Sequence, residues 1–180
     1  MNLNLQNQLK KILNGRFSQS ESTRANYARG EDTYDPVLSQ AVVFPETNEE
    51  VSQILKLCNE NKVPVVPFGT GTSLEGHAVG NDKGITISLE KMNKVLVVNT
   101  EDFDCRVQAC VTREQLNEYL REDGVFFPID PGANAAIGGM ASTSASGTMA
   151  VKYGTMKSVI TGLTVILPNG DIINTGGRAK

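Results

Sequence analysis

Residues 41–77 read AVVFPETNEEVSQILKLCNENKVPVVPFGTGTSLEGH, and the pattern in this stretch decides the fold of the first part of the chain. Residues 41–44 are an apolar run typical of a short buried strand. Residues 63–67 are a second strand, whose prolines suit a sheet edge or a strand end. Between the two strands, Thr47 and Glu50 form a capping box that opens a helix with apolar residues at helical spacing. The stretch therefore predicts a strand–helix–strand unit with parallel strands.

The sequence then turns to strands. Three strand-like runs, at about ten-residue spacing, have the rhythm of a meander; they are residues 85–89, 95–98 and 105–109. Near the end of the chain, residues 163–167 and 171–174 flank Asn169-Gly170, which is a strong signal for a hairpin turn. We expect these segments to form β-structure after the first unit.

A second capping box lies between the meander and the hairpin. Thr112 with Gln115 predicts the start of a helix that Gly124 ends. We expect this helix to turn three side chains inward, those of Leu116, Tyr119 and Leu120. The helical and β patterns together predict an α+β fold class.

Composition excludes several classes of protein. The 180 residues include 17 Lys and Arg against 20 Asp and Glu, a formal net charge of −3. A nucleic-acid surface needs clustered basic side chains, so we expect no nucleic-acid partner. No apolar run approaches the ~20 residues of a membrane-spanning helix, so we expect no membrane span. His77 is the only histidine, which excludes a two-histidine metal centre, and we predict no metal site.

The three cysteines point to a reducing compartment. Cys58, Cys105 and Cys110 form no C-x-x-C pair, and we expect each to be a small buried apolar residue. We expect a cytoplasmic protein, with a mitochondrial location or peripheral membrane association left open.

The first residues of the chain allow two interpretations. Residues 1–20 contain three basic residues and no acidic one, a composition also seen in organelle presequences. The alternative is a first amphipathic helix over residues 3–13, whose apolar residues fall at helical spacing. We favour the helix.

The first candidate site is the glycine-rich segment 67–77, which directly follows a predicted strand. Glycines let the backbone approach a ligand closely, and successive N–H groups can converge on an anion, so a diphosphate is the natural ligand. The segment lacks the lysine of a Walker loop, and Leu74 stands where the third glycine of a dinucleotide fingerprint belongs. An ordinary glycine-rich connection is the alternative.

The second candidate site is the small-residue segment 130–155. Nearly every side chain in its central part is tiny, so the segment buries little apolar surface of its own. Ordering it costs ~1–2 kcal/mol per residue of backbone entropy unless something packs against it. A large flat ligand packed against the segment would offset this cost. Tight packing of the segment against a neighbouring helix is the alternative.

These segments carry a family resemblance. The chain resembles the amino-terminal half of the flavin-binding domain of FAD-linked oxidases of the vanillyl-alcohol oxidase (PCMH-type FAD-binding) superfamily. It is most similar to the branch that contains D-lactate dehydrogenase and the glycolate oxidase FAD subunit. The matching stretches cover essentially the whole chain: residues 41–69, VVPFGTGTSLEGH (65–77), VQACVTREQLNEYL (107–120), FFPIDPGANAAIGGMASTSASGT (126–148), KYGTMKSVITGLTVILPNGDII (152–173) and TGGRAK (175–180).

The resemblance implies FAD as the cofactor and assigns its contacts. In the first segment these are Pro67, Phe68, Gly69, Thr70, Gly71, Thr72, Ser73 and Leu74, which cradle the pyrophosphate, with Gly76 and His77 closing the loop. In the second segment they are Pro131, Gly132, Ile137, Gly138, Gly139, Thr143, Ser146, Gly147, Tyr153 and Gly154. The family's first helix aligns with residues 3–13, which supports the helix interpretation.

His77 and Ser144 are two positions at which members of the family differ. In some wider relatives a histidine in or near the first loop bonds covalently to the flavin, and His77 is placed for that role. Because the branch resembled here generally holds FAD without a covalent bond, we expect a noncovalent role. Ser144 stands where asparagine or glycine is frequent in the family.

The resemblance also implies the architecture and the reaction. We expect a truncated PCMH-type domain over residues 1–180, with a first lobe over about residues 1–68 and the start of a mixed or antiparallel second lobe over 69–180, and without a substrate-binding cap domain. The implied function is oxidation of a small D-2-hydroxy acid to the 2-oxo acid by hydride transfer to FAD.

The resemblance leaves the catalytic residues, the electron acceptor and two alternative functions open. No catalytic residue is assigned, because in this family the base and the substrate-binding groups come from the absent part, and no electron acceptor is assigned either. The alternatives are a non-catalytic flavin-binding module and an enzyme similar to alkylglycerone-phosphate synthase. We expect the fragment alone to be inactive, to hold FAD weakly and to self-associate through an exposed sheet edge.

Overall fold

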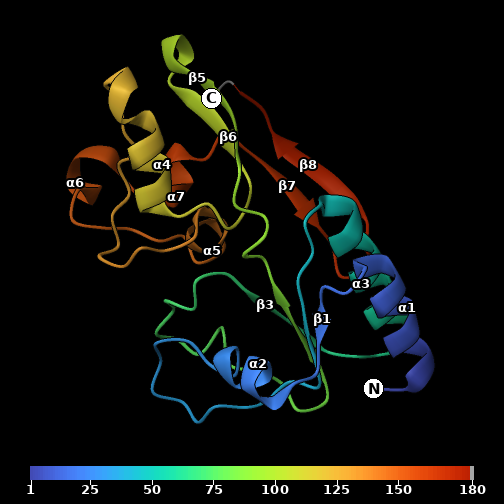
Figure 1. The fold of residues 1–180 in the computed structure, drawn as a ribbon. Helices are drawn as coiled ribbons and strands as arrows, with labels where there is room; N and C mark the ends of the chain where they lie inside the picture. Colours follow the sequence, from blue (N-terminus) through green and yellow to red (C-terminus); the bar gives the residue numbers. More distant parts are fainter. Residues whose placement is uncertain (179–180) are drawn as a thin grey trace. The chain divides into compact units, whose positions relative to one another are not determined.

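The computed structural model describes residues 1–178, and these residues form two compact units (Figure 1). The first unit comprises residues 1–91 and 164–174. The second comprises residues 92–163 and the segment from Thr175 on. The last two residues of the TGGRAK stretch, 179 and 180, lie outside the described residues.

A four-stranded sheet forms the centre of the first unit. Its strands lie in the order β1 (Phe17–Ser18), β2 (Val42–Val43), β4 (Ile85–Ser88) and β3 (Val65–Phe68). β2 and β3 both run parallel to β4, whereas β1 is antiparallel to β2. The strands predicted at residues 41–44 and 63–67 correspond to β2 and β3, and their predicted parallel orientation is therefore confirmed. The predicted edge position of β3, which contains proline, is confirmed as well.

The structure corrects the predicted pairing at β4. The expected meander would place β4 beside the next strand along the chain, but β4 instead lies between β2 and β3. All four of its residues are buried. Ile85 and Ile87 enter the core, and the hydroxyl of Thr86 pairs with that of Ser39 at 2.8 Å. A strand whose two faces are both buried belongs in the centre of a sheet, which spacing along the sequence does not reveal.

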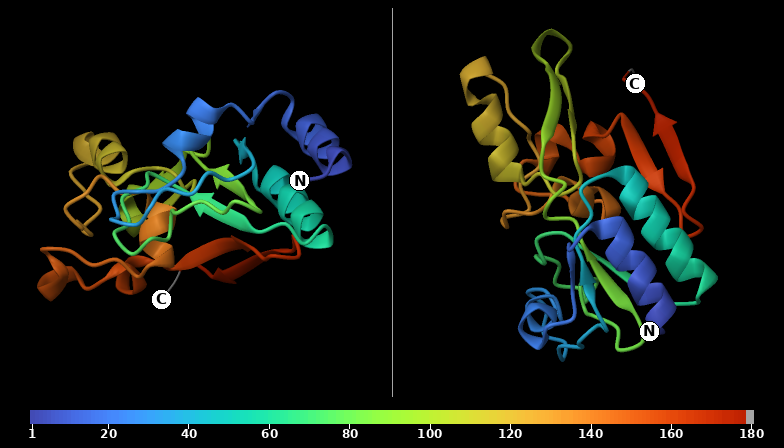
Figure 2. Two further views of the ribbon diagram at one scale, coloured as in Figure 1. Left: turned by 90° about the horizontal axis from the view of Figure 1, so that it is seen from below. Right: turned by 45° about the vertical axis from the view of Figure 1, so that its right-hand side comes forward.

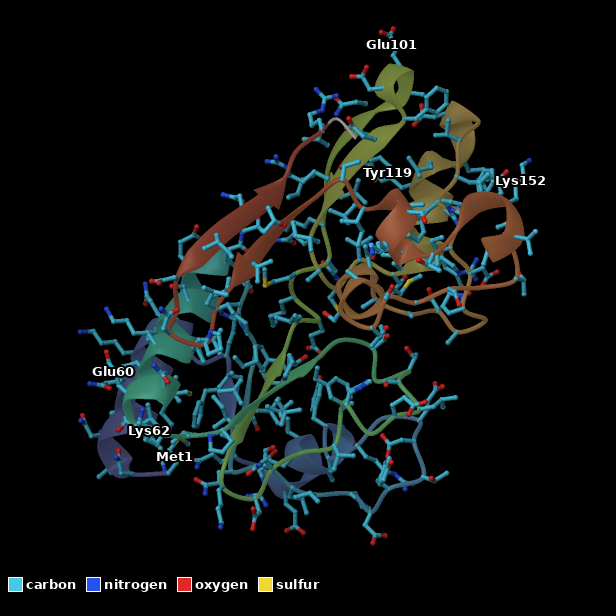
Figure 3. All side chains as sticks on the ribbon, turned by 180° about the vertical axis from the view of Figure 1, so that it is seen from behind. Met1, Glu60, Lys62, Glu101, Tyr119 and Lys152 are labelled. Carbon is cyan, nitrogen blue, oxygen red and sulfur yellow. The ribbon has the colours of Figure 1, made fainter. Side chains whose placement is uncertain are left out.

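Two helices lie side by side in the first unit (Figure 2). Helix α1 (Leu3–Leu13) confirms the predicted helix at its predicted bounds, and it begins at Asn2, whose side chain accepts from the Leu5 N–H. Helix α3 (Asn48–Glu60) begins at Thr47, whose hydroxyl accepts from the Glu50 N–H, as the capping box predicts. Glu60 and Lys62 mark its exposed end in Figure 3.

The core of the first unit joins these helices to the sheet. It consists of Leu5, Leu9, Leu13, Ala41, Val43, Ile54, Cys58, Ile85 and Ile87. Burial of Cys58 raises the pKa of its thiol to about 11, so this cysteine behaves as a small apolar residue, as predicted.

An ion pair ties the chain after α1 to the first turn of α3. The guanidinium of Arg16 donates to both carboxylate oxygens of Glu50, at 2.7 and 2.5 Å, and to the carbonyl of Phe44 at 3.0 Å. The side chains of Arg16 and Glu50 are only 20% and 19% exposed. The hydrogen bonds from Arg16 hold the pKa of the Glu50 carboxyl below its ordinary 4.5.

This ion pair predicts an acid-sensitive contribution to stability. Because the folded-state pKa of Glu50 is lowered, its stabilisation is complete above about pH 4.5 and is lost as the pH falls below that value. We expect Glu50→Gln to lower the free energy of unfolding by about 1–2 kcal/mol at pH 7 and by less at pH 3. Urea unfolding at both pH values measures this, with Glu49→Gln as the exposed control. A pH-independent difference for Glu50→Gln would contradict the prediction.

The second unit contains an antiparallel pair of strands and one longer helix. β5 (Val95–Asn99) pairs with β6 (Asp104–Val107), and a short 3₁₀ turn (Thr100–Asp102) joins them. Helix α4 (Arg113–Leu120) begins at Thr112, whose hydroxyl accepts from the Gln115 N–H. A second 3₁₀ turn (Arg121–Asp123) follows and ends at Gly124 in the left-handed conformation, as the sequence predicts.

Two burial predictions in this unit are wrong. Tyr119, labelled in Figure 3, is 58% exposed. Leu116 and Leu120 are buried as predicted, but they form a narrow stripe four residues apart, and Tyr119 lies at its edge with its hydroxyl in reach of water. Cys105 is exposed, whereas Cys110 is buried as predicted. Cys105 lies on the two-stranded β5–β6 sheet, to which no third strand of the described chain is added.

Three short helices, which the sequence did not predict, lie within and directly after the small-residue segment. They are α5 (Ile137–Ser142), α6 (Ala150–Tyr153) and α7 (Met156–Val159). Met140 and Met156 form a small core with Ile129 and Ala135. Helix α2 (Glu21–Asn26) in the first unit is a further short helix that the sequence analysis missed.

The predicted hairpin is confirmed. β7 (Gly162–Ile166) and β8 (Ile172–Gly176) form a separate two-stranded sheet joined by the Asn169-Gly170 turn (Figure 1). Gly170 has φ +89, and its carbonyl accepts from the Ser52 hydroxyl at 2.5 Å. Within residues 1–178, no helix is both long and apolar enough to cross a bilayer.

Candidate functional site

The first candidate element is the loop of residues 67–77, here called the first strip. It leaves the sheet at the end of β3, with Pro67 still in the strand and exposed. Phe68 is buried, and Tyr27 packs edge-on against its ring at a centroid distance of 5.0 Å. The loop packs against this aromatic pair.

Gly71 lies directly against the Phe68 ring. Its backbone has φ +73, and a Cβ built on it would lie 2.8 Å from the Phe68 ring. Both the left-handed backbone and the missing space require glycine here. The chain therefore passes over the aromatic ring with its main chain uncovered by side chains.

The first strip presents unpaired main-chain donors. Among the described residues, the N–H groups of Gly69, Gly71, Thr72 and Ser73 have no hydrogen-bond acceptor. The hydroxyls of Thr70 and Thr72 lie 3.4 Å apart on the same turn and are further donors. Clustered N–H donors without protein acceptors, with hydroxyl groups beside them, are typical of a loop that binds an anion.

A hydrogen bond closes the far end of the first strip. The Ser73 hydroxyl lies 2.8 Å from Nδ1 of His77, and both residues reach solvent. Gly76 between them has φ +74, and a Cβ there would lie 2.8 Å from the ring of Tyr34. Leu74 is 68% exposed, so it contributes no side-chain packing to the loop.

The second candidate element comprises residues 130–154, here called the second strip. Its entry is fixed by Asp130, whose carboxylate accepts from the Gly132 N–H at 3.0 Å and pairs with Arg113 at 3.4 Å. Gly132 has φ +90, and Pro131 before it is exposed.

Helix α5 is anchored through its first residues. Ile137 and Gly138 donate their N–H groups to the carbonyls of Val111 and Ala109, each at 2.8 Å. A Cβ on Gly138 would lie 2.8 Å from that of Ala109, so Gly138 allows close contact between the two segments. At Gly138 the small residue therefore serves backbone packing, which the sequence allowed as the alternative to ligand binding.

Gly139 differs from its neighbour. No heavy atom of the described residues lies within 4 Å of a Cβ built on Gly139, and its N–H has no acceptor among them. Packing within the described chain therefore gives no reason for glycine at this position. The face of α5 that carries Gly139 is therefore open at this position.

The turn after α5 is held by its own backbone. Ala145 donates its N–H to the carbonyl of Met140 at 2.9 Å, and Ser144 donates to Ala141 at 3.3 Å. These two bonds form a Schellman motif, in which glycine is usual at the position of Ser144. Ser144 has φ +51, a left-handed conformation that glycine and asparagine adopt more readily than serine.

Ser144 therefore carries removable strain. We expect Ser144→Gly to raise the free energy of unfolding by about 0.5–1 kcal/mol, because a left-handed backbone costs serine about that much. Ser142→Gly is the control, because Ser142 lies inside α5 and glycine there should destabilise by a similar amount. Thermal unfolding of both variants measures the effect. A lower melting temperature for Ser144→Gly would contradict the assignment.

The remaining predicted contacts lie further along the second strip. Ser146 and Gly147 also have N–H groups without acceptors among the described residues. The Thr143 hydroxyl donates to the Gly139 carbonyl at 3.1 Å. Tyr153 packs edge-on against Phe126 at 5.7 Å, and Gly154 follows with φ +78. Lys152, labelled in Figure 3, lies over the Tyr153 ring at 5.0 Å.

The structure adds residues that sequence analysis missed. Gly30, Glu31 and Tyr34 contact the first strip, and Asp32 accepts hydrogen bonds from two of them, although the sequence shows only a polar stretch there. No periodic pattern marks them, and the only local signal is a glycine beside an acidic residue. The described residues contain no group of three His, Cys, Asp or Glu side chains able to hold a metal ion.

Comparison with known proteins identifies the family of this domain. Residues 39–176 match the FAD binding domain family. The chain is 43% identical over 175 residues to D-lactate dehydrogenase [cytochrome], mitochondrial, from Arabidopsis thaliana, covering 96% of this chain and 31% of that protein. It is 33% identical over 164 residues to glycolate oxidase subunit GlcD from Bacillus subtilis, covering 90% of this chain and 35% of that protein. The chain thus spans about a third of these relatives.

Solved structures share the fold. An alkyldihydroxyacetonephosphate synthase matches 99% of this chain and 34% of its own, with a TM-score of 0.86 and 22% identity. A p-cresol methylhydroxylase matches 96% of this chain and 35% of its own, with a TM-score of 0.76 and 23% identity. These likenesses confirm the predicted α+β, PCMH-type fold. With the family match over most of its length, the chain belongs to the FAD binding domain family.

Proposed function

We propose that this chain binds FAD through its two strips, as the FAD-binding part of an oxidoreductase that converts a D-2-hydroxy acid to the 2-oxo acid. The substrate class is that of D-lactate or glycolate, because the relatives that cover most of this chain are named for these substrates. The noncovalent mode of binding and the individual contact residues are parts of the same proposal.

One observation carries the assignment of the cofactor. The N–H groups of Gly69, Gly71, Thr72 and Ser73 have no acceptor among the described residues, and they lie on a loop that aromatic packing holds in place. A pyrophosphate supplies acceptor oxygens for such a cluster without needing a cationic side chain. The first strip therefore fits the pyrophosphate of FAD.

The second strip fits a flat group. Gly139 leaves one face of α5 free of side chains, and further unpaired N–H groups follow at Ser146 and Gly147. Main-chain atoms approach a planar ring closely where no Cβ intervenes. We therefore assign to this strip the contacts that hold and orient the flavin.

The chemistry of the reaction divides between cofactor and protein. When bound, FAD supplies the acceptor for the hydride from the α-carbon of the acid. The residues of this chain bind and orient it through main-chain donors. We assign no catalytic residue in the described part of the chain.

Calorimetry of the 180-residue chain with FAD tests the proposal, with riboflavin as the comparison ligand because it lacks the pyrophosphate. We expect binding of FAD and at least about tenfold weaker binding of riboflavin. Absence of heat with FAD would overturn the proposal. Acid precipitation of the complex should leave the yellow colour in solution, whereas a yellow pellet would show a covalent bond, with His77 the first residue to examine.

The names of the relatives differ in what they say of location. The Arabidopsis relative is named as mitochondrial, and the Bacillus relative carries no such term. We propose a cytoplasmic location, which fractionation of cells that express the tagged protein would test.

The hairpin is the place where we expect self-association. Leu163, Ile172 and Ile173 on β7 and β8 are each about 40% exposed, and both outer edges of this two-stranded sheet are unpaired in the described chain. We expect sedimentation velocity to show association that increases with concentration, and Ile173→Lys to reduce it. Thr175→Lys, on the same strand, is the control for added charge. A monomer at all concentrations would contradict this expectation.

A further inference from the structure

The carboxylate of Asp32 is buried, with 6% of the residue exposed. Its two oxygens accept main-chain hydrogen bonds, from Gly30 N–H at 3.1 Å and from Tyr34 N–H at 3.0 Å. An aspartate that bonds on both sides of itself bends the chain into a tight loop. Asp32 thus organises residues 30–34, here called the support loop.

The support loop touches the first strip at Gly71. Glu31 donates its N–H to the Gly71 carbonyl at 2.8 Å. A Cβ on Gly30 would lie 2.2 Å from the same carbonyl oxygen, so the two backbones are in direct contact. The carbonyl of Gly71 is held on this side, and because a peptide unit is planar and trans, the Thr72 N–H of the same unit is held pointing to the opposite side.

The same loop touches the first strip again at Gly76. The Tyr34 ring occupies the space of a Cβ on Gly76, at 2.8 Å. The carbonyl of Tyr34 in turn accepts from the Arg29 guanidinium at 3.1 Å. One loop therefore contacts both glycines of the first strip that have positive φ.

We propose that Asp32 is a positioning residue for FAD binding, acting through the support loop on the first strip without touching the cofactor. This inference rests on the proposed function. Its physical basis is preorganisation, because a loop already held in its binding conformation loses less conformational entropy when the ligand binds. The carboxylate holds Gly30 and Tyr34; Gly30 and the adjoining Glu31 contact Gly71, and Tyr34 contacts Gly76.

The direction in which Asp32→Asn changes FAD affinity distinguishes a positioning role from a simple charge effect. A negative charge near a pyrophosphate opposes its binding, so a carboxylate with no positioning role would make Asp32→Asn bind FAD more tightly. If the carboxylate orders the loop, Asp32→Asn weakens FAD binding, because the amide accepts through one atom only. Asp32→Ala, which accepts no bond, should weaken it further.

The experiment measures FAD affinity by calorimetry and amide hydrogen exchange by NMR, both on the 180-residue chain. For Asp32→Asn we expect affinity to fall about tenfold and exchange at Gly30, Glu31 and Tyr34 to accelerate. Asp35→Asn, an exposed aspartate on the adjoining segment, should change neither. Gly30→Ala changes no charge but displaces the Gly71 carbonyl, and it should weaken binding as well.

Each outcome decides one claim. Unchanged or tighter FAD binding by Asp32→Asn, in a wild type that binds FAD, would overturn the positioning role. A wild type that binds no FAD would defeat the proposed function, and unchanged amide exchange in Asp32→Asn would then also defeat the ordering of the loop. If Asp32→Asn does not fold, Gly30→Ala decides the role of the support loop by the same two measurements.

Discussion

Gly139→Ala is expected to weaken FAD binding about tenfold or more while leaving the chain without ligand as stable as the wild type, or more stable. The added methyl group meets no described atom within 4 Å, so the fold accommodates it. Inside a helix, alanine is favoured over glycine by up to about 1 kcal/mol. The same methyl group stands on the open face of α5, where we place the flavin, and it would hold the cofactor away from the main chain.

Two measurements on one protein check this prediction. Thermal unfolding without ligand gives the stability, and calorimetric titration with FAD gives the affinity. Gly177→Ala is the matched control, because a Cβ there also meets no described atom within 4 Å and the residue belongs to neither strip. Wild-type FAD affinity in Gly139→Ala would show that the open face of α5 does not approach the cofactor.

Gly147→Ala is expected to have the opposite profile, with a loss of stability as its primary effect. A Cβ on Gly147 would lie 1.8 Å from the carbonyl oxygen of Asp130 and 2.3 Å from its carbonyl carbon. Both atoms belong to main chain, so no side-chain rotation relieves the contact. We expect the free energy of unfolding to fall by about 3 kcal/mol, because the backbone at both ends of the second strip must move.

Urea unfolding followed by circular dichroism measures this effect. The hydrogen bond from Thr148 N–H to the Asp130 carbonyl, at 3.3 Å, is the first we expect to break. FAD binding should be lost together with the fold, unlike in Gly139→Ala. An unfolding midpoint equal to that of the wild type would contradict the close approach of these two segments.

The contrast between these variants separates two roles of small residues. Gly138 and Gly147 are small because main chain or a Cβ of the same unit lies against them. Gly139 is small although nothing in the described chain lies against it. For this segment the sequence allows both cofactor binding and backbone packing. In the structure, packing accounts for Gly138 and Gly147, whereas the space beside Gly139 is unfilled among the described residues.

Local signals in the sequence predicted most of the regular elements. The caps at Thr47 and Thr112 and the Asn169-Gly170 turn act within a few residues of themselves, so they are readable without the rest of the chain. The same holds for α1, where Leu5, Leu9 and Leu13, four residues apart, are all buried. The family resemblance added the FAD-binding fold, which the comparisons confirm.

Pairing and burial were predicted less well, because partners distant in sequence decide them. The expected meander holds for β5 and β6, which pair antiparallel, but it was wrong for β4, which lies between two strands that precede it in the chain. Tyr119 and Cys105 were expected to be buried, but no local pattern shows how far a core extends over a helix or a strand. The short helices α5, α6 and α7 have too few residues for periodicity to reveal them.

By itself, the sequence determined where the chain must turn and where it leaves its backbone bare, because glycine spacing and capping residues express local conformational preference. Only the tertiary structure decided which bare segments are filled by the protein and which stay open. It also placed the support loop of Asp32, from a stretch that reads as merely polar, against Gly71 and Gly76. Contacts between segments forty residues apart depend on how the whole unit packs, and no local preference encodes them.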